Sequence, residues 1–260
     1  MDLDVKQFNL RTGDLTGVDC ELCRNKGQIA VKAVDASGNP SFAIKRCICM
    51  DARISAQRME ASGLGDLAEK CTFENFDTVD PWQRKLKQSA MDYLDIEAFK
   101  RGDWFFAGGQ VGCGKTHLCT AICTHLIRDH RMSLRYMQWA VESVRLKGMV
   151  NDESFAEELD KLVQPNVLYI DDLFKTPRQM GGSWAAMPSD ADIRLAFEII
   201  NARYIGRSKI TIISSERTIR EILDVDESTG SRIMQRCGSW VFNIKRDPER
   251  NYRMKGEQQL

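Results

Sequence analysis

Short apolar runs alternate with segments of helical apolar spacing through most of the chain. After one of these runs, Leu118, Ile122 and Leu126 recur at the spacing of a helix that packs on a sheet. The runs are short and continuous, as in strands buried on both faces of a parallel sheet, and they lie at 104–107, 167–170 and 210–213. The pattern predicts an α/β fold in which a parallel sheet is flanked by helices.

Weaker patterns predict the remaining elements of this fold. A second strand is expected at 133–137 and an edge strand at 240–244. Helices are expected at 81–100, at 139–162 and from Ser189 onward, where a capping pattern precedes apolar residues at helical spacing.

Four cysteines stand in two pairs around a predicted β-hairpin near the N-terminus. Strands are expected at 28–34 and 41–46, with a turn between them. Cysteine pairs at both ends of a hairpin can converge into a tetrahedral thiolate site for Zn²⁺, and four thiolates would make it structural. The alternative is four unrelated reduced cysteines. The residues concerned are Cys20, Cys23, Cys47 and Cys49.

The chain is expected to have four successive parts. The cysteine module has too little core to fold alone, so metal binding would supply its folding energy. We place this module at 1–50, a linker helix at 51–70, the nucleotide domain at 71–246 and a polar tail at 247–260.

One stretch after the first buried run has the pattern of a phosphate-binding loop. Its glycines let backbone N–H groups turn inward around anionic oxygens. Lys115 would supply a cation for the β- and γ-phosphates, and Thr116 a hydroxyl ligand for Mg²⁺. A strand, a glycine loop and a helix N-terminus follow one another, as a phosphate site requires. The loop consists of Gly109, Gln110, Val111, Gly112, Cys113, Gly114, Lys115 and Thr116.

Polar residues follow two of the predicted strands at their carboxyl ends, where ligands of an α/β sheet sit. Asp171 is expected to hold Mg²⁺, and Asp172 to polarise the attacking water. Ser214 and Ser215 end another strand, where a hydroxyl could hydrogen-bond the γ-phosphate or its water. The alternative for these serines is a cap on the next helix.

Three further features each allow two interpretations. Phe73 and Phe76 are either packing anchors or a stacking face beside the adenine. The basic and aromatic segment 174–188 suits either single-stranded nucleic acid or an ordinary solvated loop. Arg232 and Arg236 lie one helical turn apart, on a face that is either solvated or functional.

Composition narrows the class of protein. Hydrophobic residues make up 43% and charged residues 28% of the 260 residues, as in a globular protein with a core. Because 37 basic residues balance 37 acidic ones, a nucleic-acid contact would need a local patch. No apolar run could span a bilayer. Nine cysteines without a secretory signal indicate reduced thiols and a cytoplasmic location.

The combined motifs resemble a known family. The phosphate loop continuing into His117, the Asp171–Asp172 pair and the stretch 230–236 are similar to bacterial and phage helicase loaders of the DnaC/DnaI type. These loaders are AAA+ ATPases, and the resemblance covers about 70–246. It implies that His117 belongs to the nucleotide-binding segment and that the sensor residue falls on Ser214 or Ser215. A trans-acting arginine finger would fall on Arg232 or Arg236.

The resemblance also implies partners. ATP–Mg²⁺ would bind one subunit, and the finger of the next subunit would reach its γ-phosphate, so that hydrolysis reports on assembly. Copies would assemble in an open ring or spiral on single-stranded DNA. The zinc module would bind a DnaB-type replicative helicase and allow its ring to be placed on DNA.

Three other functions compete with helicase loading. IstB-type transposition helpers share the ATPase core but bind duplex DNA and a transposase, and they usually lack a zinc module. A P-loop phosphotransferase would need an acceptor site and an arginine-rich lid, which the motifs do not supply. A nucleotide-gated adaptor would bind ATP with little hydrolysis, and would keep its function when Asp172 is changed to Asn.

Overall fold

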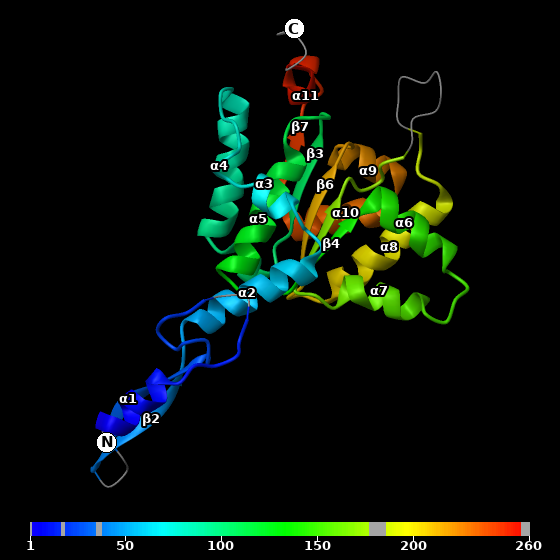
Figure 1. The fold of residues 1–260 in the computed structure, drawn as a ribbon. Coiled ribbons are helices and arrows are strands. Elements are labelled where there is room, and N and C mark those ends of the chain that lie inside the picture. The colour runs from blue at the N-terminus through cyan, green and yellow to red at the C-terminus, as the bar shows by residue number, and fades with distance from the viewer. Residues whose placement is uncertain (1, 17–18, 35–37, 177–185, 256–260) are drawn as a thin grey trace.

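The computed structural model describes residues 2–16, 19–34, 38–176 and 186–255. A small N-terminal module projects from a larger α/β body, and the helix α2 (Cys49–Ser62) leads from one to the other (Figure 1). Arg178 and Trp184, from the segment predicted to suit nucleic acid, lie outside the described residues.

The body is built on a five-stranded sheet in which all neighbouring strands are parallel. The strand order is β4-β5-β6-β3-β7, so the strand predicted at 240–244 does lie at an edge. The predicted parallel sheet is therefore confirmed. The strands are β3 (Phe105–Gly109), β4 (Leu134–Gln138), β5 (Val167–Asp171), β6 (Ile210–Ser215) and β7 (Val241–Ile244).

Helices cover both faces of the sheet. In β5, Tyr169 packs into one apolar cluster while Leu168 and Ile170 pack into another, as expected for a strand buried on both faces. The first cluster also contains Leu118, from the helix that follows the phosphate loop. The helices are α4 (Pro81–Asp95), α5 (Lys115–Arg128), α6 (Trp139–Gly148), α7 (Phe155–Val163), α8 (Asp190–Ile205), α9 (Ile219–Val225) and α10 (Glu227–Cys237), with a 3₁₀ turn at Ala98–Arg101. No helix of the described ranges is long and apolar enough to cross a membrane.

The N-terminal module contains the predicted hairpin of β1 (Gln28–Val34) and β2 (Pro40–Arg46), paired antiparallel. It also contains a helix that the polar N-terminal sequence did not predict, α1 (Asp2–Leu10). This helix is tied to the hairpin because the Asn9 amide donates to the carbonyl of Ala30 and accepts from its N–H.

The helix predicted as a linker at 51–70 spans only Cys49–Ser62 and packs against the body. It begins at Cys49, inside the cysteine module, and lies across the C-terminal end of α5. There the Ser55 hydroxyl is within hydrogen-bonding distance of the carbonyl oxygens of Ile127 and Arg128, at 3.4 and 3.1 Å. A short helix, α3 (Leu67–Lys70), follows.

The C-terminal segment, predicted as a polar tail, instead folds back onto the phosphate loop. It forms a 3₁₀ turn at Pro248–Arg250 and the short helix α11 (Tyr252–Lys255). The Tyr252 N–H donates to the Gly112 carbonyl at 3.0 Å, and the Asp247 N–H donates to the side-chain oxygen of Gln110 at 2.8 Å. The sequence did not indicate this, because the contacts join residues more than 130 positions apart.

Candidate functional site

The phosphate loop connects the end of β3 to the start of α5. Gly112 and Gly114 both have positive φ, at 70° and 89°, which only glycine adopts without strain. A Cβ at Gly114 would lie 2.6 Å from the Phe76 ring, so the ring and the loop are packed too closely for any side chain there. The sequence around the loop therefore fixes the shape expected of an anion cradle.

Lys115 and Thr116 begin α5 and point to different partners. The buried ammonium group of Lys115 donates to the carbonyl oxygens of Gly109 and Gln110, where a phosphate oxygen would compete for the same hydrogens. The Thr116 hydroxyl donates to Asp171 Oδ1 at 2.9 Å. The loop thus joins the carboxyl end of β5 directly.

Asp171 is buried, with an exposed fraction of 5%, and its carboxylate accepts four side-chain hydrogen bonds. Its Oδ1 accepts from Thr116, from Tyr169 at 2.8 Å and from Ser214 at 2.5 Å. Its Oδ2 accepts from the Tyr136 hydroxyl at 3.1 Å. Burial and the charge of Asp171 raise the pKa of Tyr136, so this phenol stays a donor at neutral pH. Neither tyrosine could be recognised as part of the site from the sequence, because no local pattern marks them.

A hydroxyl and a carboxylate side by side form an oxygen donor set that suits Mg²⁺. Thr116 Oγ1 and Asp171 Oδ1 meet this requirement, because they lie 2.9 Å apart at the start of the helix that follows the phosphate loop. These two residues could hold Mg²⁺, which would supply positive charge beside the phosphates.

The two serines at the end of β6 have different roles. Ser214 contacts Asp171 and also accepts from the N–H of Asp172 at 2.9 Å. Ser215 donates to the Leu173 carbonyl at 2.7 Å and accepts from the Arg217 N–H, so its hydroxyl is used within the strand-to-helix turn. Of the two residues predicted as sensor candidates, Ser214 is the one placed beside the acids.

Asp172 stands in the left-handed region of the backbone, with φ of 59°. Its carboxylate pairs with the Lys175 ammonium at 2.7 Å, and that ammonium also contacts Glu216 at 3.1 Å. Glu216 follows the predicted serine pair and was not singled out from the sequence.

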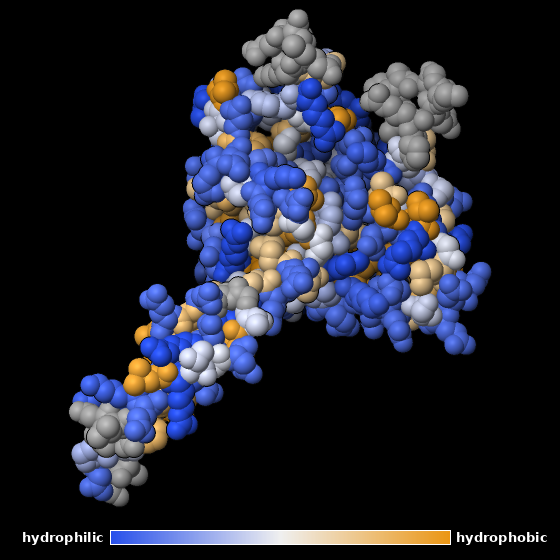
Figure 2. Space-filling model, in the orientation of Figure 1, coloured by the Kyte–Doolittle hydropathy of each residue, from blue (hydrophilic) through white to orange (hydrophobic). Residues whose placement is uncertain are grey.

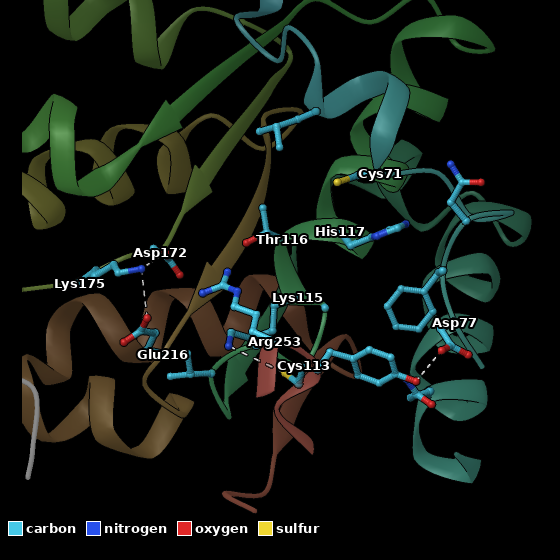
Figure 3. Close-up of a pocket in the computed structure, with 18 residues that line it drawn as sticks. Cys71, Asp77, Cys113, Lys115, Thr116, His117, Asp172, Lys175, Glu216 and Arg253 are labelled. Atoms are coloured by element: carbon cyan, nitrogen blue, oxygen red, sulfur yellow. Dashed lines mark hydrogen bonds and ion pairs between the residues drawn. The ribbon is translucent and has the colours of Figure 1, made fainter. Parts of the chain in front are cut away.

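These elements enclose a cavity of about 410 Å³, which is adequate for a nucleotide (Figure 3). The phosphate loop and His117 lie in its middle, between Asp77 and Cys71 on one side and Asp172, Lys175 and Glu216 on the other. Arg253 from α11 reaches into the middle, beside Lys115. The cavity is lined by Leu67, Cys71, Asn75, Phe76, Asp77, Gln83, Val111, Gly112, Cys113, Gly114, Lys115, Thr116, His117, Asp172, Lys175, Glu216, Tyr252 and Arg253.

Phe76 and His117 form part of the wall. Their rings meet edge to face, with centroids 5.3 Å apart, and His117 Nε2 lies 2.6 Å from the Thr72 carbonyl oxygen. Phe76 thus packs against the loop and borders the cavity, and its stacking on an adenine stays a prediction. Phe73 packs against the core.

Arg232 and Arg236 lie on α10, away from this cavity. The Arg236 guanidinium donates to four backbone carbonyls and lies over the Trp104 ring. Arg232 lies against the Phe197 and Tyr204 rings of α8 and donates to the side chain of Asn201 and to the Ser228 carbonyl. Arg236 therefore makes more hydrogen bonds within this chain than Arg232 does.

The four cysteines of the N-terminal module come together as predicted. Their sulfur atoms all lie within 4.8 Å of one another. The Cys20–Cys47 and Cys23–Cys49 sulfur pairs are 3.7 and 3.5 Å apart, close to the roughly 3.8 Å between thiolates on a tetrahedral Zn²⁺. The cluster could hold that ion.

The pKa values of two thiols in the cluster differ widely. Burial raises the pKa of Cys49 to about 12. Burial acts in the same direction on Cys23, but hydrogen bonds from the Gly27 N–H and the other thiols bring its pKa down to about 6. The Cys23 thiol therefore loses its proton more readily than the Cys49 thiol.

Comparison with known proteins identifies the family. Residues 49–237 match the model of the IstB-like ATP binding proteins. The chain belongs to this family. Two relatives come from Bacillus subtilis (strain 168). The uncharacterized protein YqaM is 35% identical over 208 residues, which is 78% of this chain and 64% of YqaM. The phage-like element PBSX protein XkdC is 30% identical over 251 residues, which is 94% of this chain and 89% of XkdC.

Solved structures agree on the fold of this IstB-like protein. The DnaC helicase loader superposes with a TM-score of 0.54 and 18% identity, over 68% of this chain and 97% of that one. DnaI superposes with a TM-score of 0.52 and 21% identity, over 69% and 92%. The predicted resemblance is confirmed at the level of family and fold, and the chain is an AAA+ ATPase with an IstB-like core.

Arg253 gives a first prediction, because it brings a cation from the C-terminal segment to the phosphate loop. Replacing Arg253 with Ala should weaken binding of ATP by about tenfold, since a charge beside the phosphates is lost. Binding is measured by titration of a fluorescent ATP analogue. Arg250→Ala is the matched control, because Arg250 lies over the Trp82 ring in the same segment. Equal affinities for the two variants would contradict a role for Arg253 in the cavity.

Proposed function

We propose that this IstB-like ATPase loads a DnaB-type replicative helicase onto single-stranded DNA. The observation that carries the proposal is the joining of an AAA+ core of DnaC and DnaI fold to a separate four-cysteine module. The module projects beyond the body (Figure 1), which leaves its surface accessible to a large partner. In this proposal zinc holds the module folded.

The hairpin offers a surface suited to protein binding. Phe42 and Ile44 alternate along β2 and share one face, and Val34 joins them across the strand pair. Their exposed fractions are 46%, 50% and 67%. Hydrophobic residues reach the surface of the projecting module in Figure 2. Clustered exposed apolar residues of this kind commonly mark a binding site, and we propose that the helicase contacts them.

In the proposed ATP site, separate residues bind the phosphates, hold the magnesium ion and orient the attacking water. Lys115 and Arg253 bind phosphate oxygens, Thr116 and Asp171 hold Mg²⁺, and Asp172 orients and polarises the attacking water. The magnesium ion would neutralise charge that develops on the phosphates. Ser214 holds Asp171 and the Asp172 backbone in place.

The proposed arginine finger is Arg232 rather than Arg236. Moving Arg236 would remove a donor from four carbonyls, those of Gly102, Tyr204, Arg207 and Lys209. Three of these bonds are partly buried, and losing partly buried hydrogen bonds is costly. Arg232 is held by two ring faces, one side-chain amide and the exposed Ser228 carbonyl, contacts that a phosphate of the adjacent subunit can replace.

Transposition help of the IstB kind is the second candidate, and the family match favours it. That match begins at residue 49 and leaves most of the cysteine module outside. The module is therefore the feature that favours helicase loading over transposition help.

The finger assignment predicts a complementation result. Arg232→Ala and Lys115→Ala should each reduce ATP hydrolysis by about 10³-fold, because one lacks the finger and the other the phosphate cation. An equimolar mixture should recover hydrolysis, since an intact loop can then face an intact finger. Phosphate release measures the rates. If Arg232→Ala hydrolyses ATP normally, or if the mixture stays inactive, Arg232 is not a finger acting in trans.

The partner assignment predicts zinc-dependent capture. Immobilised full-length chain should retain a replicative helicase, and Phe42→Ser with Ile44→Ser should abolish retention because the apolar contact is lost. Prior removal of zinc with a chelator should abolish it too. Val141→Ser is the matched control, because Val141 is an apolar residue of α6 that is 61% exposed. Retention of duplex DNA and no helicase by the unmodified chain would favour the transposition-helper function.

A further inference from the structure

A three-member ion cluster closes one end of the candidate nucleotide cavity. The Lys175 ammonium lies between the carboxylates of Asp172, at 2.7 Å, and Glu216, at 3.1 Å. All three side chains line the cavity and face one another at the side opposite Asp77 (Figure 3). Neither Lys175 nor Glu216 has a part in the proposed binding of ATP described above.

The backbone holds Lys175 in this position. The turn after β5 uses the left-handed conformation twice, at Asp172 and Phe174, with φ of 59° and 60°. The Lys175 N–H donates to the Asp172 carbonyl at 2.9 Å, and the Phe174 ring is buried against Trp139. Non-glycine residues adopt this conformation only when their surroundings enforce it. The ammonium is therefore carried on a fixed turn, not on a loose loop.

The second carboxylate is fixed by the neighbouring strand. Glu216 follows β6 directly, and the Leu173 N–H donates to the Ser214 carbonyl at 2.9 Å, which links the turn to the end of β6. Burial opposes the charge on Lys175, but the two carboxylates outweigh it and raise its pKa. One cation thus stands between two anions that share a single cavity end.

The position of the cluster relates it to the terminal phosphate. Strand β5 ends in Asp171, which fits the magnesium, and the cluster begins at the next residue. The aromatic and polar wall around Phe76 and Asp77 lies at the other side of the phosphate loop. A nucleotide whose base occupies that wall extends its phosphates past Lys115 toward the cluster. A third phosphate would then approach two carboxylates and one ammonium.

We propose that Lys175 determines the preference of this site for a nucleoside triphosphate over a diphosphate. The ammonium offsets the repulsion between the γ-phosphate and the carboxylates of Asp172 and Glu216, and it offers the phosphate a direct partner. A diphosphate does not reach the cluster and gains nothing from it. The Glu216 carboxylate repels the γ-phosphate and so reduces the preference, which therefore depends on both Lys175 and Glu216.

This inference rests on the proposed assignment of Lys115 and Thr116 to the phosphates and magnesium. The test measures affinities of the full chain for ADP and for the non-hydrolysable triphosphate AMPPCP, both with Mg²⁺. Lys175→Met, which keeps the side-chain length, should weaken AMPPCP binding about tenfold and change ADP binding less than about twofold. Lys175→Arg, which keeps the charge, should retain the preference. Glu216→Gln should increase it.

Two results with Lys175→Met would overturn the proposal: an unchanged ratio of the two affinities, as when both nucleotides lose equally, or tighter AMPPCP binding. Lys115→Ala separates this from a failure of the site itself. If Lys115→Ala binds both nucleotides as well as the unmodified chain does, the assignment of the phosphate loop is wrong and the inference falls with it.

Discussion

The structure depends on the hydrogen bond between the Thr116 hydroxyl and Asp171. A buried carboxylate is costly unless donors surround it, and Asp171 obtains its donors from four elements: α5, β4, β5 and β6. Satisfying this one group therefore fixes the phosphate loop relative to three neighbouring strands. The same contact brings together the oxygens that suit a magnesium ion, so the requirement of folding and the requirement of chemistry coincide at one residue.

Helix α5 connects this centre to the N-terminal module. Its first residues are Lys115 and Thr116, and its last turn accepts the Ser55 hydroxyl of α2 at the carbonyls of Ile127 and Arg128. Helix α2 in turn begins at Cys49, one of the four clustered cysteines. The cysteine cluster and the phosphate loop are thus joined by two packed helices and not by a free linker. A partner bound to the module and a nucleotide in the cavity would act on the same rigid elements.

The sequence predicted those parts of the site that are carried by local patterns. The phosphate loop, the acids ending β5 and the two cysteine pairs are short motifs whose backbone setting follows from glycine, strand and hairpin signals. Tyr136, Glu216 and Arg253 could not be found in this way. Strand pairing brings Tyr136 to Asp171, and folding brings Glu216 and Arg253 to the cavity. The environment of Arg236 was hidden for the same reason: its four carbonyl partners lie 27 to 134 positions away. The polar composition of 247–255 predicted a tail, because no sequence pattern indicates the backbone contacts of this segment to the phosphate loop.

We propose that this chain uses ATP to place a replicative helicase ring on single-stranded DNA. The most direct measurement is the amount of helicase that stays on closed circular single-stranded DNA through a high-salt wash, after incubation with the chain and ATP. We expect retention with the unmodified chain, and only background retention with Lys115→Ala or without ATP. Equal retention with Lys115→Ala, or none with the unmodified chain while it hydrolyses ATP, would contradict it.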